Sequence, residues 1–222
     1  MAFEWTEDEL PFPLTDIDRA HLKLSDDKFE PHTWDQLKTI IAEHDLSALK
    51  RWPSDLRRYI KWSIEIREKY GSVPNYVRLV RLQWTALPSS SPSTGPQFAV
   101  KSPVPFADAA DYKILVNDWP YGYDDPSIKH IIVWLKNRLE SEPVRGDMTP
   151  RSRQQVNDFI QKTFVDRVKE LQGHSDKVMW FRNWTALQSI PGIEHVHLFV
   201  RDVPDDVIAE WTGSDTPVSS QT

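Results

Sequence analysis

The chain has no cysteine among its 222 residues, which excludes disulfides, thiolate nucleophiles and thiolate metal sites. It also lacks an apolar run of the length that a membrane-spanning helix needs. The first ten residues, MAFEWTEDEL, are acidic, whereas signal and transit peptides are not. We therefore expect an intracellular, cytoplasmic protein with no membrane partner.

Tryptophan is frequent, with 10 residues, and indoles both fill cores and line pockets for planar ligands. The net charge of −6 is unevenly distributed. Residues 1–45 carry 12 acidic and 4 basic groups, while residues 46–81 carry 3 acidic and 9 basic groups. A basic segment can bind a polyanion locally even in an acidic protein. The alternative is a solvated helix face that balances the acidic N-terminal region.

Helix signals dominate the first half of the chain. Thr33 followed by Gln36 fits a capping box at the start of one helix. Pro53 lies in the first turn of a second helix, which we expect to run to Tyr70 and to end at Gly71. Residues 75–84 predict a third helix.

The second half alternates strands with one long helix. Residues 112–117 and 130–136 are typical of strands, and so are residues 178–183 and 195–201. Between the two pairs, residues 150–172 carry an amphipathic helical pattern. Short links within each pair favour antiparallel hairpins. The sequence therefore predicts an α+β fold: a helical N-terminal part followed by a β-β-α-β-β antiparallel sheet with a packed helix.

One integrated domain with five segments is expected. These are an irregular acidic arm (1–32), a helical, basic segment (33–84), a Pro- and Ser-rich linker or loop (85–107), the sheet core (108–211) and a disordered tail (212–222).

The last predicted strand carries the most reactive side chains. Its alternation places His195 and His197 on one face and apolar residues on the other. Histidine can give and take protons near neutral pH, and the loop before the strand, with Asn183 and Ser189, can cradle an anion or a carbonyl oxygen. The alternative is a pair of hydrogen-bonded histidines on an exposed sheet face. A metal site is not expected, because a His-x-His pair needs further ligands and His130 is the one nearby candidate.

Three further groups of residues suggest binding sites, each with a plainer alternative. A strand end that continues into an aromatic turn suggests a pocket wall or a packed β-turn; it comprises Asn117, Trp119, Tyr121 and His130. Three clustered carboxylates can hold a guanidinium or form a solvated turn; they are Asp26, Asp27 and Glu30. Cations interleaved with aromatic residues suit nucleic-acid contacts; they are Lys50, Arg51, Arg57, Arg58 and Lys61.

The motifs NDWPYG, HIIVW, FRNW, QSIP and HVHLF resemble the histidine-triad superfamily across residues 112–202. The matching positions are Asn117, His130, Asn183, Ser189, His195 and His197. Phe199 replaces the last histidine of that pattern, and residues 192–194 are additional. The resemblance implies a nucleotide hydrolase or transferase in which the middle histidine, His197, attacks a phosphate.

A second resemblance covers most of the chain. HTWDQLKTIIA, LKRWPSDLRRYIKW, ILVNDWPYG and EHVHLFVR look like the fungal N-acetylglucosamine-induced protein family. One branch of that family comprises arginine-containing cyclodipeptide synthases of secondary metabolism, and its Asp-Asp-x-x-Glu motif matches Asp26, Asp27 and Glu30.

Membership of that branch implies arginyl-tRNA and a second aminoacyl-tRNA as partners, with no DNA, cofactor or metal. The implied roles are His197 as general base or nucleophile with His195 in support, and Ser189 as the alternative nucleophile. The loop that begins at Asn183 would donate to the oxyanion. A non-catalytic, nucleotide-binding response protein is a third possibility.

Overall fold

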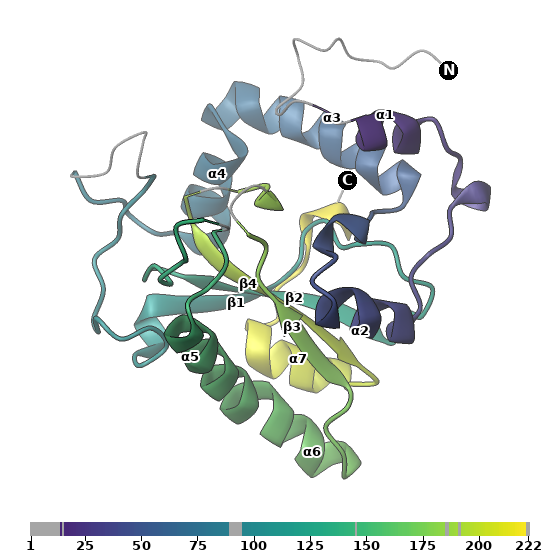
Figure 1. The fold of residues 1–222 in the computed structure, drawn as a ribbon. Helices are drawn as coiled ribbons and strands as arrows, with labels where there is room; N and C mark the ends of the chain where they lie inside the picture. The colour runs from purple at the N-terminus through teal and green to yellow at the C-terminus, as the bar shows by residue number, and fades with distance from the viewer. Residues whose placement is uncertain are drawn as a thin grey trace.

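The computed structural model describes residues 14, 16–88, 95–144, 146–184, 187–190 and 192–220. Within them, four strands form one antiparallel sheet in the order β1-β2-β4-β3 (Figure 1). The strands are β1 Tyr112–Val116, β2 Ile128–Leu135, β3 Val178–Phe181 and β4 Glu194–Arg201. Helical residues 150–172 lie between β2 and β3 along the chain. The predicted β-β-α-β-β order and α+β class are therefore confirmed.

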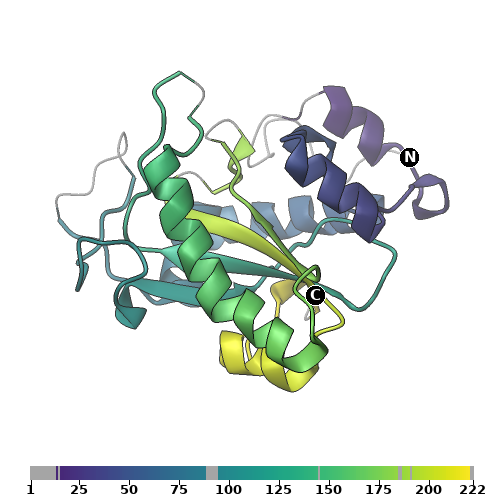
Figure 2. The ribbon, with the colours of Figure 1, turned by 60° about the horizontal axis from the view of Figure 1, so that its bottom comes forward.

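Helices cover both faces of this sheet, as Figures 1 and 2 show. One face packs against α5 Pro150–Ile160, the π-helical turn η6 Gln161–Val165, α6 Asp166–Gln172 and α7 Asp205–Thr212. The other face packs against α3 Pro53–Tyr70, α4 Val73–Tyr76 and the π-helix η4 Val77–Leu82. α2 Trp34–Ala42 lies against β3. The remaining elements are α1 Asp16–Leu22, η2 Asp26–Lys28, η3 Leu46–Ala48, η5 Ala109–Asp111 and η8 Val218–Ser220.

Local signals set the helix ends as the sequence predicts. The Thr33 hydroxyl accepts a hydrogen bond from the Gln36 N–H (3.2 Å), and the Gln36 side chain accepts one from the Thr33 N–H (2.8 Å). Pro53 begins α3, and Gly71 ends it at φ 79°, a left-handed conformation that favours glycine. The predicted third helix differs, because α4 gives way to the π-helix η4 at Val77.

The histidine-bearing face of β4 is covered. His195 and His197 lie opposite Trp134 and Ile132 of β2, on the face where α3 contributes Ile60 and other apolar residues to a common core. Both histidines are less than one tenth exposed. The alternative of histidines on an exposed sheet face is therefore wrong, because α3 occupies the place where water would be.

The N-terminal arm is not irregular throughout, as the prediction for residues 1–32 had it. Residues 16–22 form α1, and Arg57 of α3 donates to the backbone carbonyls of Leu22 and Leu24, each at 3.0 Å. A seven-residue helix has too few apolar positions to show periodicity, and tertiary contacts hold this one in place. Residues 1–13 and 15 lie outside the described part of the chain.

The tail and the linker also differ from the predictions. Asp215 accepts two hydrogen bonds from Arg81, each at 2.8 Å, and Val218 is buried, so residues 212–220 are not disordered. In the predicted linker, Phe98 is buried, and the Asp111 carboxylate accepts from the Lys101 N–H at 2.8 Å. Composition did not predict these contacts, because it does not show which residues lie next to these segments in the fold.

None of the helices in the described residues combines the length and hydrophobicity that a bilayer crossing requires.

Candidate active site

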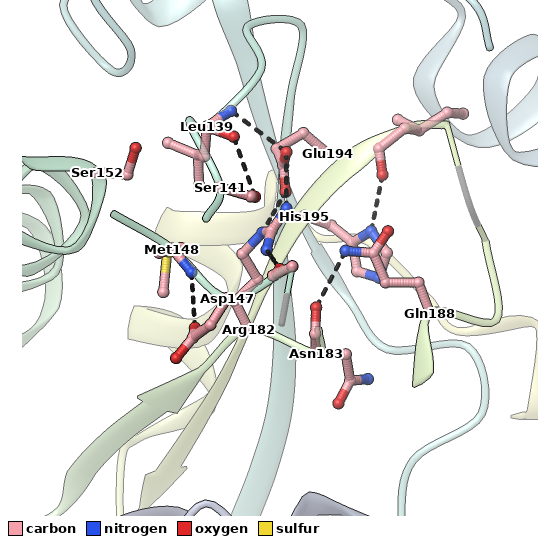
Figure 3. A network of polar contacts seen from close by, with 12 residues as sticks. Leu139, Ser141, Asp147, Met148, Ser152, Arg182, Asn183, Gln188, Glu194 and His195 are labelled. Carbon is pink, nitrogen blue, oxygen red and sulfur yellow. Dashed lines mark hydrogen bonds and ion pairs between the residues drawn. The ribbon is translucent and has the colours of Figure 1, made fainter. Parts of the chain in front are cut away.

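Three buried histidines and two asparagines meet on the α3 side of the sheet. His130 Nε2 lies 3.0 Å from His197 Nδ1, and Asn183 Nδ2 lies 3.3 Å from His197 Nε2. His195 Nδ1 lies 2.8 Å from the carbonyl oxygen of Ile193 (Figure 3). The exposed fractions of His130, His195 and His197 are 1%, 3% and 6%. Hydrogen bonds to protein atoms, rather than to bulk water, therefore set the tautomers of these rings.

The hydrogen bond to Ile193 fixes the tautomer of His195. A carbonyl oxygen can only accept, so His195 Nδ1 carries the proton and Nε2 keeps a lone pair. Burial lowers the pKa of His195 below 6.5, against smaller opposing effects of this carbonyl and of Glu194. At neutral pH the ring is therefore uncharged, with Nε2 free to accept a proton.

The tautomer of His197 is not fixed in the same way as that of His195, because His197 shares a proton with His130. Burial lowers the pKa of both rings well below 6.5, and the charge of Arg51 lowers them further. When the shared proton is on His197 Nδ1, Nε2 is an acceptor, as the Asn183 amide requires. When the proton is on His130, His197 Nε2 becomes a donor. Its capacity to act as a base thus depends on its neighbour.

Asn117 supports His130 without choosing its tautomer. Asn117 Nδ2 lies 3.1 Å from Nδ1 and 3.2 Å from Nε2 of His130. Because the distances are nearly equal, the amide lies over the ring rather than along one lone pair. The Trp119 N–H donates to Asn117 Oδ1 at 3.0 Å, which fixes the orientation of the amide.

A cavity of about 50 Å³ is lined by His195 and His197, and a second cavity, of about 250 Å³, is lined by Asn183. Arg51 and Tyr121 line both of them. The smaller cavity is largely aromatic, with walls that include Trp62, Trp119, Trp134, Ser189, His195 and His197. The larger cavity has a mixed lining, in which Leu46, Leu49, Leu56 and Leu187 stand beside Asp18, His21, Ser47, Lys50 and Asn183. The histidine cluster thus borders the smaller, aromatic cavity and reaches the larger one through Asn183, which bonds to His197.

Most of the predicted pocket residues come together here. Asn117, Trp119 and Tyr121 line the smaller cavity, as does Ser189. His130 lies behind the wall, with its ring stacked on Tyr121 at a centroid distance of 5.4 Å. Asn183 lines the larger cavity. Pro191, in the predicted anion-binding loop, lies outside the described residues.

The acidic triplet does not join the site. Asp26, Asp27 and Glu30 are exposed, and neither described cavity has them in its lining. The Asp26 carboxylate accepts from the N–H and the hydroxyl of Ser54, at 2.9 Å and 2.6 Å, and so caps the first turn of α3. Asp26 of the Asp-Asp-x-x-Glu motif thus caps a helix, and the motif lines neither of the described cavities.

The predicted basic surface is also partly occupied. Arg57 holds the carbonyls that follow α1, while Arg58 bonds to Asp55 at 2.9 Å and to the Ser219 carbonyl. Lys50 and Lys61 are exposed, and Lys50 lines the larger cavity. The described residues contain no group of three or more metal-ligating side chains.

Sequence reasoning missed a buried ion pair beside His195. Arg182 Nε lies 2.6 Å from Glu194 Oε1, with exposed fractions of 5% and 3% for the two side chains. Glu194 Oε2 also accepts from the Leu139 N–H at 3.2 Å (Figure 3). The pair connects the end of β3 to the start of β4, directly before His195. The available signal was one cation near the end of one predicted strand, Arg182, and one anion just before another, Glu194.

A second ion cluster contributes Arg81 and Asp118 to the lining of the smaller cavity. Arg81 bonds to Asp118 at 2.9 Å and to Asp215 at 2.8 Å. Burial raises the pKa of Asp118, although the charge of Arg81 opposes this effect. The Val218 N–H donates to the same carboxylate at 2.9 Å. The cluster thereby fastens the C-terminal segment to the turn that carries the pocket residues.

The free energy of unfolding is expected to decrease as the pH is lowered from about 7.5 to about 5.5, a range that lies above the pKa values of most carboxylates. Because burial lowers the pKa of His130, His195 and His197, the unfolded chain binds protons there that the folded chain does not. Each histidine adds a slope of about 1.4 kcal/mol per pH unit below its unfolded pKa. Urea unfolding across this range measures the slope, and a constant free energy would contradict the neutral assignment.

Comparison with known proteins identifies relatives of most of the chain. Residues 33–201 match the family model described as "Protein of unknown function (DUF3605)". The chain is 28% identical to N-acetylglucosamine-induced protein 1 of Candida albicans over 190 residues, which cover 82% of this chain and 72% of the relative. It is 27% identical to the uncharacterized protein YPL067C of Saccharomyces cerevisiae over 167 residues, 75% of this chain and 77% of the relative.

A solved structure, "Crystal Structure of HTC1", has a similar fold. Its TM-score is 0.54 at 28% sequence identity, with 82% of this chain and 91% of that chain covered.

Proposed function

The chain belongs to the DUF3605 family, with the N-acetylglucosamine-induced protein among its relatives, and from that premise we propose that it is an aminoacyl-tRNA-dependent cyclodipeptide synthase. One observation carries the proposal. A neutral histidine, His195, keeps an unprotonated Nε2 in a cavity that shares Arg51 and Tyr121 with a second cavity. Two cavities that share part of their walls, one of them lined by the base, suit the joining of two substrates.

The proposed reaction is the aminolysis of an ester. The α-amine of one aminoacyl group attacks the ester carbonyl of the other, and His195 Nε2 takes a proton from the attacking nitrogen. The oxyanion then collapses, the C–O bond to the first tRNA breaks, and the leaving ribose oxygen receives that proton. A second aminolysis within the dipeptidyl-tRNA closes the diketopiperazine and releases the second tRNA. The esters supply the free energy, so the reaction balances without an oxidant or ATP.

His195 replaces His197 as the base in this proposal. The Ile193 carbonyl holds His195 in the tautomer that a base needs, whereas His197 Nε2 is free only when His130 gives up the shared proton. Ser189 lines the same cavity, and its hydroxyl is our candidate donor to the oxyanion. The proposal leaves an uncharged polar environment beside the base, formed by His197, His130 and Asn183.

The larger cavity suits an arginyl ester of a nucleotide, since such a substrate carries a cationic guanidinium and an anionic phosphate. Its lining combines one carboxylate, that of Asp18, with the cations Lys50 and Arg51. Paired charges of this kind favour a guanidinium at the carboxylate and a phosphate at the cations. In this proposal Asp18 therefore binds the guanidinium, the role that was predicted for Asp26, Asp27 and Glu30.

Two matched substitutions distinguish these carboxylates. Asp18→Asn is expected to lower the yield of arginine-containing product by about tenfold, the effect of one lost charge-assisted hydrogen bond. Asp27→Asn removes a carboxylate that neither described cavity contains and should leave the yield within about twofold. Mass spectrometry of product from purified protein and charged tRNA provides the measurement. A larger loss of yield for Asp27→Asn than for Asp18→Asn would show that the acidic triplet, rather than Asp18, binds the guanidinium.

Expression of the protein in bacteria tests the proposed activity itself. An arginine-containing cyclic dipeptide in the medium, absent from cells that express His195→Asn, would support it. Soluble protein that forms no cyclic dipeptide from arginyl-tRNA and a full set of aminoacyl-tRNAs would exclude it.

A nucleotide hydrolase or transferase is the second candidate. Its support is the hydrogen-bonded pair of His130 and His197 beside Arg51, because a positively charged group near a nucleophilic imidazole also suits attack on phosphorus. Turnover of a nucleotide conjugate without cyclic dipeptide would favour this function. Nucleotide binding without turnover would instead indicate a response protein.

A further inference from the structure

Arg51 has hydrogen-bonding groups that the described residues leave unused. Its Nε donates to the Trp119 carbonyl at 3.0 Å, and its guanidinium lies over the rings of Tyr59 and Tyr121, at 4.9 Å and 5.4 Å from their centroids. Among the described residues, no hydrogen bond or ion pair involves its Nη1 or Nη2. Four N–H groups therefore remain available beside the two cavities.

This arrangement differs from that of the other arginines near the site. Arg57 donates to backbone carbonyls, Arg81 pairs with Asp118 and Asp215, and Arg182 pairs with Glu194. Arg51 pairs with no carboxylate in the described part of the chain. Its charge is instead felt by the histidines, where it contributes to the lowered pKa of His130 and His197. A positive charge without a partner at a buried polar cluster indicates that an anion is the missing partner.

The guanidinium is also held in place. The Gly122 N–H donates to the Lys50 carbonyl at 2.8 Å, and His21 Nε2 donates to the Arg51 carbonyl at 2.7 Å. Backbone contacts on both residues, together with two aromatic rings at the side chain, fix the plane of the fork before any ligand arrives. A pre-organised fork loses little conformational entropy on binding.

We infer that Arg51 is a phosphate-binding residue at the junction of the two cavities. A guanidinium with both terminal nitrogens available matches a tetrahedral oxyanion, which it can bind through two parallel hydrogen bonds. Lys50 lines the larger cavity next to it and adds a second cation. Phosphate suits the site better than carboxylate, because the substrate's own carboxyl groups are esterified.

The source of the phosphate rests on the proposed function. If the substrate is an aminoacyl-tRNA, the phosphate is the phosphodiester that precedes the terminal adenosine. If the substrate is a smaller nucleotide, its own phosphate takes this place. In either case the phosphate anchors the nucleotide, while the reacting group extends past Tyr121 toward His195.

Binding of AMP, with adenosine for comparison, tests the inference without any reaction. The wild-type protein should bind AMP at least tenfold more tightly than adenosine, and added salt should reduce the difference. Intrinsic tryptophan fluorescence or calorimetry measures both affinities. Equal affinities for the two ligands would overturn the inference, and this measurement requires no variant to fold.

Variants locate the phosphate on the protein. Arg51→Met should weaken AMP binding at least tenfold, Arg51→Lys should restore part of the loss, and Lys61→Met should stay within twofold, because Lys61 is an exposed cation of α3 that lines neither of the two cavities. Arg51→Met that melts like the wild type and binds AMP within twofold would refute the assignment. AMP binding that needs Arg51 in a protein that forms no cyclic dipeptide would refute the proposed function alone.

Discussion

Replacement of His195 by asparagine is expected to reduce the rate of cyclic dipeptide formation by about 100-fold to 10,000-fold, the usual contribution of a general base. Asparagine is close to histidine in size, and its amide N–H can replace the imidazole Nδ1–H as donor to the Ile193 carbonyl, which the ring reaches at 2.8 Å. It offers no lone pair of suitable basicity at the position of Nε2. Single-turnover rates with arginyl-tRNA and a second aminoacyl-tRNA provide the measurement.

A surface histidine supplies the control for this experiment. His174→Asn changes an exposed side chain that pairs with Asp176 at 2.5 Å, and it should leave the rate unchanged. His197→Asn should cost less than His195→Asn, because His197 contributes to the wall rather than to proton transfer. A larger loss for His197→Asn than for His195→Asn would show that the base is His197, as the sequence first predicted.

Breaking the buried ion pair should have the largest effect on stability. Arg182→Met leaves the Glu194 carboxylate, 3% exposed, without its cation, and an uncompensated buried charge typically costs about 3–5 kcal/mol. The double substitution Arg182→Met with Glu194→Leu removes both charges and should recover part of that loss, since apolar pairs often replace buried ion pairs at little cost. Urea unfolding of the wild type and the variants measures these free energies.

An exposed arginine on the same side of the sheet gives the comparison. Arg167 is 36% exposed and pairs with Glu170 and Glu210, so Arg167→Met should leave the free energy of unfolding nearly unchanged. A similar small loss for Arg182→Met would mean that water reaches the Glu194 carboxylate and that the pair does not hold the start of β4 in place.

Short-range patterns carried most of the fold that the sequence could predict. The Thr33 capping box and the Gly71 stop lie within one helical turn of the ends that they define. The alternation in residues 195–201 likewise placed His195 and His197 together on one face of β4. Periodicity of this kind depends on neighbours in the sequence and is therefore visible without a structure.

Functional roles were harder to predict, because they depend on contacts across the chain. Asp26 meets Ser54, and Arg57 meets carbonyls more than 30 residues away. Composition cannot distinguish such a partner from a substrate, so capping and scaffolding residues resembled binding residues. For the same reason, the sequence grouped Arg51 with its neighbours and could not show that, among the described residues, its two terminal nitrogens make no hydrogen bond or ion pair.

The cover that α3 forms over the histidines limits the shape of what can react. Tyr59 and Trp62 of that helix line the cavity and are buried, so a long polymer cannot lie across β4 with an internal bond at His195. Only a narrow end of a substrate can enter the cavity. The unpaired 3′ end of a tRNA has that form, whereas a continuous duplex does not. Selectivity for the end of a nucleic acid over its interior would thus follow from the position of α3, without recognition of the base sequence.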